Sequence, residues 1–452
     1  MSTRGCLDSS LVDQVWLDEL SEFLRIPSVS ADPLHDAHVR EAGEWLRDFV
    51  RRSGGDAELV ETSANPLVVG EFRASSGDAD AATVLAYGHF DVQPPAPLEL
   101  WESDPFEPTV RDEWLYARGV GDDKGQIWAL LKGAALLATE GALPVNVRIA
   151  CDGEEEVGGP SIGEFLDGDT RGADACVIFD SGMEARDVPA ICTGTRGVLS
   201  FDLAVRTGAR DLHSGVFGNA ALNATHALMQ ALGGILPRDG RLPDELRVGV
   251  AQPSEEERAG WTQLTPGADV LTSAGAVPYD PAAADEFYLR TTAEPSVDVN
   301  GVLGGKPGLR NTTVPVAAEA NFSVRLAPGQ DVATVSEAVQ RLVRRAAPAG
   351  AEIDLELKAS AEPGYVSPDE PAVQIALDAF EHVMGRRPLL SRSGGTLPIL
   401  PELVKHGIPT ILTGIVLPES NIHSPNERVL LEYLPLGVDL ARELYTRLAA
   451  LK

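Results

Sequence analysis

The sequence contains few cysteines and an excess of negative charge, and both properties exclude classes of protein. Its 452 residues include four cysteines without a Cys-x-x-Cys spacing: Cys6, Cys151, Cys176 and Cys192. Two of them lie in apolar, strand-like runs, so we expect reduced thiols in the cytoplasm rather than a disulfide framework. The net charge of −31 argues against binding to nucleic acid or to an anionic membrane surface, because both require a basic footprint.

Long apolar runs are also missing. No run reaches the about 18 residues that a membrane helix needs, and the hydrophobic fraction of 44% is ordinary for a soluble α/β protein. The first thirty residues carry acids where a signal peptide would have its apolar segment, so we read no export signal. We find no internal repeat and no low-complexity tract. A chain of this length is expected to form about two domains.

The spacing of apolar residues in the first half of the chain alternates between strand-like and helix-like. Strands are predicted near 58–61, 67–72, 83–86, 145–151 and 175–179, and helices near 10–25, 36–52, 126–139 and 161–166. This alternation favours an α/β fold with a mainly parallel sheet covered by helices. From 371 onward the same pattern returns.

The middle of the chain has a different pattern. Between 197 and 358 the order is strand, helix, two strands, helix and strand, interrupted by a Pro- and Glu-containing insert at 236–292. This order predicts a compact α+β, ferredoxin-like domain inserted into the first domain. The predicted domains are therefore 1–195 and 363–452, which together form one domain, and 196–362, which forms the inserted one.

Polar side chains follow the predicted strands at the points where these strands end. His89 and Asp91 stand two residues apart on extended chain, so both side chains leave the same face. Open α/β sheets build their sites beyond the carboxyl ends of their strands. The full set of such side chains is His89, Asp91, Asp122, Glu155, Glu156, Asp180 and His423.

Two imidazoles and several carboxylates suit a pair of divalent ions, and zinc is favoured by mixed nitrogen and oxygen ligands. A carboxylate that bridges the ions, with one imidazole and one further carboxylate on each, leaves room for a bridging water whose pKa falls toward neutrality. A nearby carboxylate that binds no metal would take the proton. The pattern therefore predicts a two-metal hydrolase.

Four motifs give the chain a resemblance to a known family over nearly its whole length. They are Trp101-Glu-Ser-Asp-Pro-Phe-Glu-Pro108, Arg118-Gly-Val-Gly-Asp-Asp-Lys-Gly125, Asp211-Leu-His-Ser-Gly-Val-Phe-Gly218 and His423-Ser-Pro-Asn-Glu427. The chain resembles the co-catalytic di-zinc peptidases and deacylases, which include aminoacylase, acetylornithine deacetylase, succinyl-diaminopimelate desuccinylase and carnosinase. It is most similar to the branch of carnosinase and cytosolic nonspecific dipeptidase.

The resemblance implies two divalent metal ions, with Zn²⁺ expected and Mn²⁺ or Co²⁺ as alternatives. Asp122 would bridge them, and a cis peptide bond would follow it. His89 and Asp180 would complete the protein ligands of one ion, and Glu156 and His423 would hold the other.

The resemblance also implies catalytic roles outside the ligand set. Asp91 would orient His89, and Glu155 would be the general base and later the proton donor. The inserted domain would be a lid that pairs two chains into a homodimer. His213 would then reach the partner's site and stabilise the oxyanion.

On the substrate side, Arg325 would grip a carboxylate, a task suited to a planar and always charged fork. Thr312, Gly395 and Thr396 would add contacts. The chain departs from the family at Ser393, where an acid is usual, at Asn219, where a glycine is usual, and in the segment 308–311. These departures bear on specificity and leave the metal chemistry intact.

The predicted function is hydrolysis of dipeptides or similar small aminoacyl amides. The alternative within enzymes is an N-acyl-amino-acid deacylase that uses the same metal site. A third hypothesis is an inactive homologue that binds peptides, and the intact ligand set with Glu155 argues against it.

Overall fold

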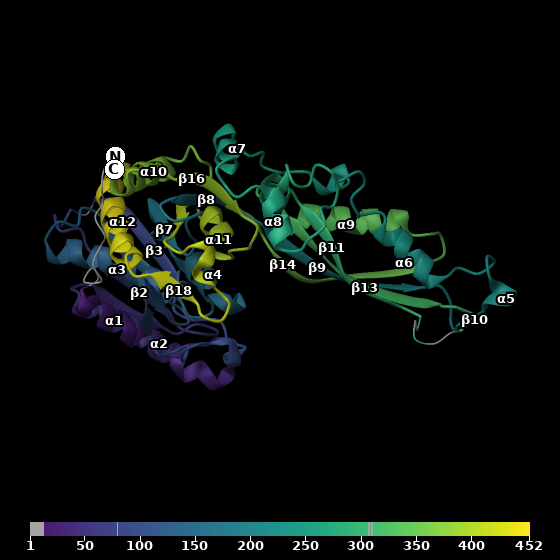
Figure 1. Ribbon diagram of the computed structural model, residues 1–452, viewed down its shortest axis with the longest axis horizontal. Coiled ribbons are helices and arrows are strands. Elements are labelled where there is room, and N and C mark those ends of the chain that lie inside the picture. The colour runs from purple at the N-terminus through teal and green to yellow at the C-terminus, as the bar shows by residue number, and fades with distance from the viewer. Residues whose placement is uncertain (1–12, 79, 306–307, 309–310) are drawn as a thin grey trace. The chain divides into compact units, whose positions relative to one another are not determined.

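The computed structural model describes residues 13–78, 80–305, 308 and 311–452 (Figure 1). The chain forms two compact units, and each is described by itself. The first consists of Met1–Thr193, Val366–Ser391 and Glu402–Lys452, and the second of Gly194–Tyr365 and Arg392–Pro401. The predicted inserted domain, 196–362, falls within the second unit. Its expected boundaries stay a prediction.

A twisted sheet forms the centre of the first unit. Its strands follow the order β1 (Asp56–Val60), β2 (Leu67–Phe72), β6 (Asn146–Asp152), β3 (Thr83–His89), β7 (Ala175–Phe179), β17 (Thr410–Thr413) and β8 (Ala190–Thr195), and β16 (Leu389–Ser393) pairs with β8. The four strands from β6 to β17 are parallel, and β1, β2 and β8 add antiparallel margins. The central strands are buried on both faces, which explains their continuous apolar runs. The predicted mainly parallel sheet is confirmed.

Helices cover this sheet. They are α1 (Gln14–Leu24), α2 (Asp36–Arg52), α3 (Lys124–Thr139), α4 (Ser161–Gly168), α10 (Pro371–Met384) and α12 (Tyr433–Leu448). Helix α3 is apolar nearly all round because it packs against β3 and is itself covered by α12. A Cβ atom at Gly133 would lie 2.7 Å from the Cβ of Ala441, so glycine permits the two helices to approach. A small sheet of β18 (Arg428–Leu430), β5 (Trp114–Tyr116) and β4 (Thr109–Arg111) completes the unit.

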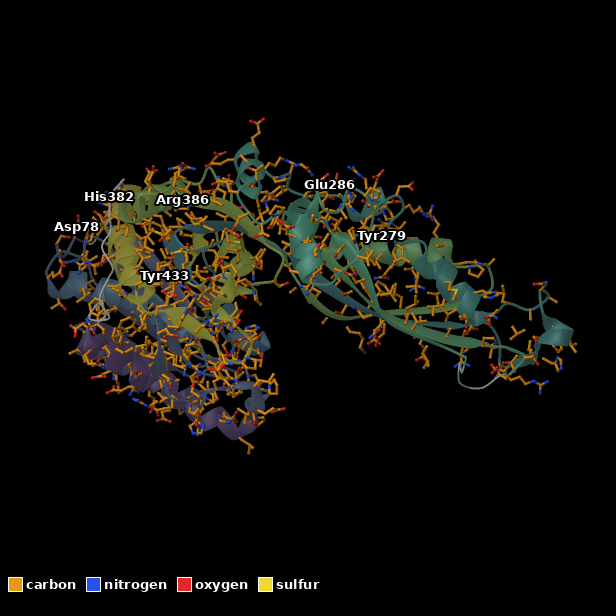
Figure 2. The ribbon with its side chains drawn as sticks, in the orientation of Figure 1. Asp78, Tyr279, Glu286, His382, Arg386 and Tyr433 are labelled. Carbon is orange, nitrogen blue, oxygen red and sulfur yellow. The ribbon has the colours of Figure 1, made fainter. Side chains whose placement is uncertain are left out.

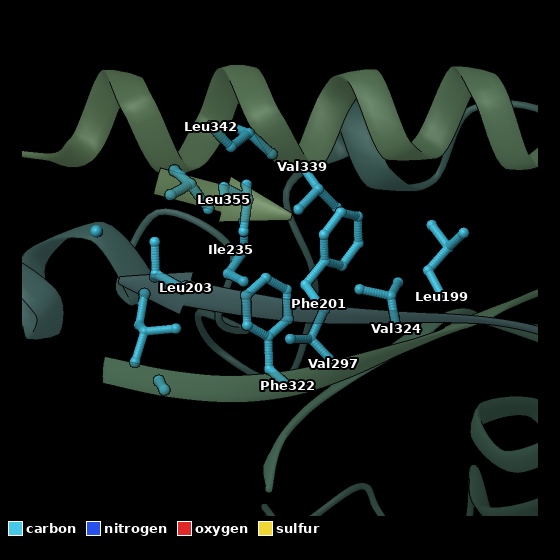
Figure 3. Close-up of a cluster of buried hydrophobic side chains, with 14 of the residues drawn as sticks. Leu199, Phe201, Leu203, Ile235, Val297, Phe322, Val324, Val339, Leu342 and Leu355 are labelled. Carbon is cyan, nitrogen blue, oxygen red and sulfur yellow. The ribbon is translucent and has the colours of Figure 1, made fainter. Parts of the chain in front are cut away.

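The second unit has a ferredoxin-like core, as predicted. Its antiparallel sheet has the order β11 (Ser296–Gly304), β13 (Ala317–Leu326), β9 (Gly197–Arg206) and β14 (Glu352–Ala361). Helices α6 (Ala224–Leu232) and α9 (Val332–Ala346) pack against it. Phe201 and Phe322 stack with ring centroids 5.2 Å apart in the centre of this core (Figure 3).

The insert at 236–292 is folded within the second unit. It contains the 3₁₀ turn Asp244–Leu246, α7 (Glu255–Trp261), α8 (Gly267–Ser273) and a π-helical turn at Leu289–Ala293. A cavity of about 440 Å³ has Tyr279 and Glu286 in its lining (Figure 2). In α7 the buried Glu257 accepts hydrogen bonds from Arg392 Nε at 2.7 Å and Arg392 Nη2 at 3.1 Å. This buried pair ties the insert to the end of β16.

The remaining short elements of the second unit carry the predicted lid motif. They are β10 (Leu212–His213), α5 (Ser214–Phe217) and β12 (Thr313–Val314). The short strand β15 (Gly364–Tyr365) instead pairs antiparallel with the end of β8, and α11 (Ile399–Lys405) spans residues of both units. Among the described helices, none has both the length and the apolar character to cross a membrane. Cys151 and Cys176 are free and buried, Cys192 is buried, and Cys6 lies outside the described residues.

Candidate metal centre

The candidate site lies where neighbouring parallel strands of the first unit end. His89 is the last residue of β3 and pairs in register with Asp152, the last residue of β6. The loops that leave these strands carry Asp91 and the pair Glu155–Glu156, and Asp180 follows β7 directly. Asp122 precedes the first turn of α3, and His423 lies in the loop before β18.

Asp122 lies between two imidazoles. His89 Nε2 is 2.9 Å from one Asp122 carboxylate oxygen, and His423 Nε2 is 2.7 Å from the other. His423 Nε2 is also 3.3 Å from Glu156 Oε2, and His89 Nε2 is 3.9 Å from Asp180 Oδ1. The structure therefore brings all five predicted ligands together. The peptide bond between Asp122 and Asp123 is cis, as the resemblance implies.

The donor set fits divalent metal ions. Ligand atoms of His89, Asp122 and Glu156 all lie within 4.8 Å of one another. One Glu156 oxygen, Oε2, accepts a hydrogen bond of 2.8 Å from Gln93, whereas the other, Oε1, is buried without a hydrogen-bond partner among the described residues. A buried carboxylate oxygen without a partner is costly unless a cation faces it. Carboxylates outnumber imidazoles here, which also favours added positive charge.

The electrostatics agree with a cation-binding role. Hydrogen bonds to Asp122 and Glu156 raise the pKa of His423 to about 10. Burial lowers the pKa of His89, but its hydrogen bonds to Asp122 and Asp91 outweigh this and raise that pKa well above its ordinary value. Burial would raise the pKa of Asp122, yet hydrogen bonds from His423 and His89 hold it well below the usual range. The negative field that holds protons on these imidazoles also attracts a metal ion to their lone pairs.

Glu155 differs from its neighbour Glu156. Its carboxylate makes no hydrogen bond or ion pair with any residue that the structure describes. Burial raises the pKa of Glu155 to about 7, with His89 acting in the opposite sense and Glu156 adding to the rise. Glu156, by contrast, is engaged by Gln93 and by His423. The adjacent pair therefore contains one carboxylate within the ligand cluster and one that is free to exchange a proton.

Asp91 contributes more than the predicted orientation of His89. His89 Nδ1 is 3.1 Å from the main-chain oxygen of Asp91 and 3.4 Å from its carboxylate Oδ1. The two Asp91 oxygens accept hydrogen bonds from the backbone N–H groups of Glu155 at 3.2 Å and Glu156 at 3.1 Å. Asp91 thus also holds the loop that carries both glutamates.

Two further buried glutamates hold loops of the site. Glu154, which a solvated acidic loop would expose, is 1% exposed and accepts hydrogen bonds from the N–H groups of Ser161 and Asn65. Glu427 Oε1 accepts from the N–H groups of Gly121 at 2.8 Å and Asp122 at 3.1 Å. Its Oε2 accepts from Gly119 N at 3.0 Å and from Arg118 Nη1 at 2.6 Å.

Sequence reasoning missed the role of Glu427, although this residue closes the motif that begins with His423. Four hydrogen bonds connect its carboxylate to the loop that positions Asp122. The side chain therefore joins the segment of one imidazole to the segment of the central carboxylate. The only signal in the sequence was a glutamate at a fixed distance after His423.

In the second unit, His213 and Thr312 lie close together. Ser214 N donates to Thr312 O at 2.9 Å, and His213 is paired with Thr313. Gly215 N donates to His213 Nδ1 at 3.0 Å, so the neutral ring carries its proton on Nε2. His213 is exposed, which leaves that N–H available as a donor.

Arg325 and Thr396 form a second group in this unit. Arg325 Nη1 donates to Thr396 Oγ1 at 3.3 Å, and Gly395 N donates to Ser393 Oγ at 3.0 Å. Ser393, the departure from the family's usual acid, thus supports the turn of this loop. Asn219, the second departure, has a φ of 62°, a left-handed conformation that asparagine tolerates better than most residues. In the third departure, 308–311, residues 309 and 310 lie outside the described residues.

Comparisons with known proteins agree with this site. A family model described as Peptidase family M20/M25/M40 matches residues 85–447. The chain is 29% identical to a cysteinylglycine-S-conjugate dipeptidase of Corynebacterium striatum, over 91% of this chain and 90% of the relative. It is 27% identical to the human Beta-Ala-His dipeptidase, over 90% and 81%. The solved M20 family metallo-carboxypeptidase of Sulfolobus solfataricus superposes with a TM-score of 0.78 at 26% identity, with coverage of 97% and 100%.

We expect the variant Glu427→Gln to bind Zn²⁺ about 10- to 100-fold more weakly, as loss of an outer partner of a metal ligand typically does. The glutamine amide would direct N–H groups at backbone N–H groups, so the loop that positions Asp122 would shift. Competition with a chromogenic chelator measures the affinity, and circular dichroism checks the fold. Glu419→Gln, an exposed position near His423, is the control. Equal affinities in both variants would contradict the role assigned to Glu427.

Proposed function

The chain belongs to the peptidase family M20/M25/M40 and is a metallopeptidase, and from this premise we propose that its substrates are dipeptides or similar small aminoacyl amides. The observation that carries the proposal is the cluster in which Asp122 lies between two imidazoles beside the unpartnered oxygen of Glu156. The names of two relatives, both dipeptidases, support the substrate class.

We assign the ligands of two ions from the observed contacts. His89, Asp122 and Asp180 would hold one ion, and Asp122, Glu156 and His423 the other, with Zn²⁺ expected and Mn²⁺ or Co²⁺ as alternatives. When bound, the pair of ions polarises the scissile carbonyl and lowers the pKa of water. Carboxylate and imidazole donors suit these borderline cations.

Glu155 is proposed as the general base. Its carboxylate has no competing partner among the described residues and lies next to Glu156 in the chain, so it can take the proton of the attacking water. The same group then returns that proton to the leaving amine. Asp91 supports this step because it fixes the backbone N–H groups of Glu155 and Glu156.

Substrate recognition is proposed for the second unit. Arg325, with Thr396 at 3.3 Å, would bind the C-terminal carboxylate, and Gly395 and Thr312 would add contacts. We further propose a homodimer in which His213 completes the partner's site as an oxyanion donor. Because Gly215 N donates to His213 Nδ1, the neutral ring carries its proton on Nε2, and this N–H supports the role of a donor. The free cysteines support the expected cytoplasmic location.

A substrate panel tests the proposed class. The purified protein, supplied with Zn²⁺ or Mn²⁺, is expected to hydrolyse free dipeptides at least tenfold faster, in kcat/KM, than N-acetyl or N-succinyl amino acids. Amine release, measured for each substrate, gives the ratio. A preference for the N-acyl substrates would assign the chain to the deacylases instead. Absence of turnover on the whole panel would indicate an inactive peptide-binding homologue.

The variant Glu155→Gln should lose about 10²- to 10⁴-fold in kcat while both metal ions remain bound, because a base that is not a ligand can be removed without emptying the site. Activity and metal content of the same preparation decide the outcome. The exposed Glu164→Gln serves as the matched control. If metal content fell together with activity, Glu155 would be a ligand and the roles of Glu155 and Glu156 would be reversed.

Subunit mixing tests His213. Homodimers of His213→Ala and of Glu155→Gln should each be nearly inactive, since removing one oxyanion donor typically lowers kcat about 10²- to 10³-fold. Their heterodimer should regain about half of the wild-type activity per dimer, because one site then combines an intact Glu155 with an intact His213. His226→Ala, an exposed histidine of the same unit, is the control. Heterodimers as inactive as their parents would contradict action in the partner's site.

A further inference from the structure

We propose that Arg196 is a second cation of the carboxylate-binding site, so that two guanidinium charges, rather than that of Arg325 alone, select substrates with a free C-terminal carboxylate. This inference rests on the dipeptidase function proposed above. It concerns a residue that follows β8 and that none of the sequence motifs contains.

Arg196 is buried and forms no ion pair with any residue that the structure describes. Its side chain donates from Nη1 to Thr291 O and from Nη2 to Ser296 Oγ, both at 2.6 Å. Its Nε is buried and has no hydrogen-bond partner in the described part of the chain. A buried cation is costly unless an anion compensates it, and neither acceptor carries a charge.

The pairing of strands places this guanidinium beside Arg325. Ser296 of β11 lies directly opposite Arg325 of β13, and directly opposed residues project their side chains from the same face of a sheet. The group that binds Ser296 Oγ therefore lies on the face that carries Arg325. Burial and the neighbouring charge of Arg325 lower the pKa of Arg196 to about 10, which leaves Arg196 charged at neutral pH.

The loop that contains Thr396 contacts both arginines. Thr396 Oγ1 donates to the main-chain oxygen of Arg196 at 2.6 Å and accepts from Arg325 Nη1 at 3.3 Å. Arg196 N donates to Gly395 O at 2.8 Å. The loop that contains Gly395 and Thr396, which we propose to contact substrate, is thus hydrogen-bonded to both Arg196 and Arg325.

A third arginine, Arg392, precedes this loop and differs from the other two in having an ion-pair partner. Arg392 is also buried, but its guanidinium forms a two-point ion pair with Glu257, at 2.7 and 3.1 Å. Neither Arg196 nor Arg325 forms an ion pair within the residues that the structure describes. The chain therefore neutralises the arginine that precedes the loop and leaves the two arginines that contact the loop available for an anion.

One carboxylate lies near the pair. Asp298 Oδ2 is 3.4 Å from Ser296 Oγ, and its charge acts on Arg196 in the stabilising direction. Asp298 thus contributes one negative charge against the two positive charges of the arginines. A carboxylate is the ligand of matching charge, and it also fits the guanidinium fork geometrically.

The experiment compares Ala-Ala with its C-terminal amide. Arg196→Gln is expected to raise the KM for Ala-Ala about tenfold and to leave the KM for the amide and both kcat values within about twofold. Arg196→Lys, which keeps the charge, should retain most of the affinity. Arg325→Lys is the positive control, and Arg206→Gln, which removes an exposed charge from the same unit, is the matched negative control.

Calorimetric binding of both compounds in a Glu155→Gln background separates this inference from the proposed function. If neither compound is hydrolysed by the wild type, but the carboxylate strengthens binding and Arg196→Gln removes that gain, the dipeptidase proposal fails and the role of Arg196 stands. If Arg196→Gln weakens binding of dipeptide and amide equally, or changes neither, Arg196 only supports Thr291 and Ser296, and the inference is overturned.

Discussion

Several carboxylates lie together at the buried carboxyl ends of the parallel strands. The groups that neutralise or hydrogen-bond each carboxylate determine its role in the site. Asp91, Glu154 and Glu427 accept hydrogen bonds from backbone N–H groups, so their charge is satisfied by the chain and they hold loops in place. Asp122, Glu156 and Asp180 instead face imidazoles or have a carboxylate oxygen without a partner. The hydrogen-bond partners thus separate the carboxylates that hold loops of the site from the carboxylates that we propose as metal ligands.

The second unit contains buried arginines, and their partners again divide them into two groups. Arg392, in β16, is neutralised by Glu257 of the insert, whereas neither Arg196 nor Arg325 forms an ion pair with a described residue. The long insert at 236–292 therefore supplies the anion for the buried arginine of β16. Thr291, at the end of the insert, also accepts a hydrogen bond from Arg196.

The sequence predicts the role of a site residue when that residue belongs to a contiguous motif. It does not predict the role of a residue whose hydrogen-bond partners are distant in the sequence. The cluster of predicted ligands could be found in the sequence because each member follows a predicted strand or precedes a predicted helix. Its members in this group are His89, Asp122, Glu156 and Asp180. Glu427 was not, because the backbone N–H of Asp122 that it accepts from is 305 residues away. Strand β8 was missed because only its first three residues, Ala190 to Cys192, are apolar, so its sequence shows neither a longer apolar run nor an alternation. Arg196 lacked a signal because its burial and the lack of an ion pair with any described residue emerge only in the folded chain.

The packing of α12 over α3 has a consequence for folding during synthesis of the chain. Helix α3 ends at Thr139, yet the residue that meets Gly133, Ala441, is synthesised about three hundred residues later. The nascent chain therefore carries an apolar helix without its cover throughout the synthesis of the second unit, most of which is contiguous and can fold first. A pause or a truncation before α12 would leave that surface open to aggregation or to a chaperone. For this chain, the last residues of the first unit are synthesised only after the whole of the second unit.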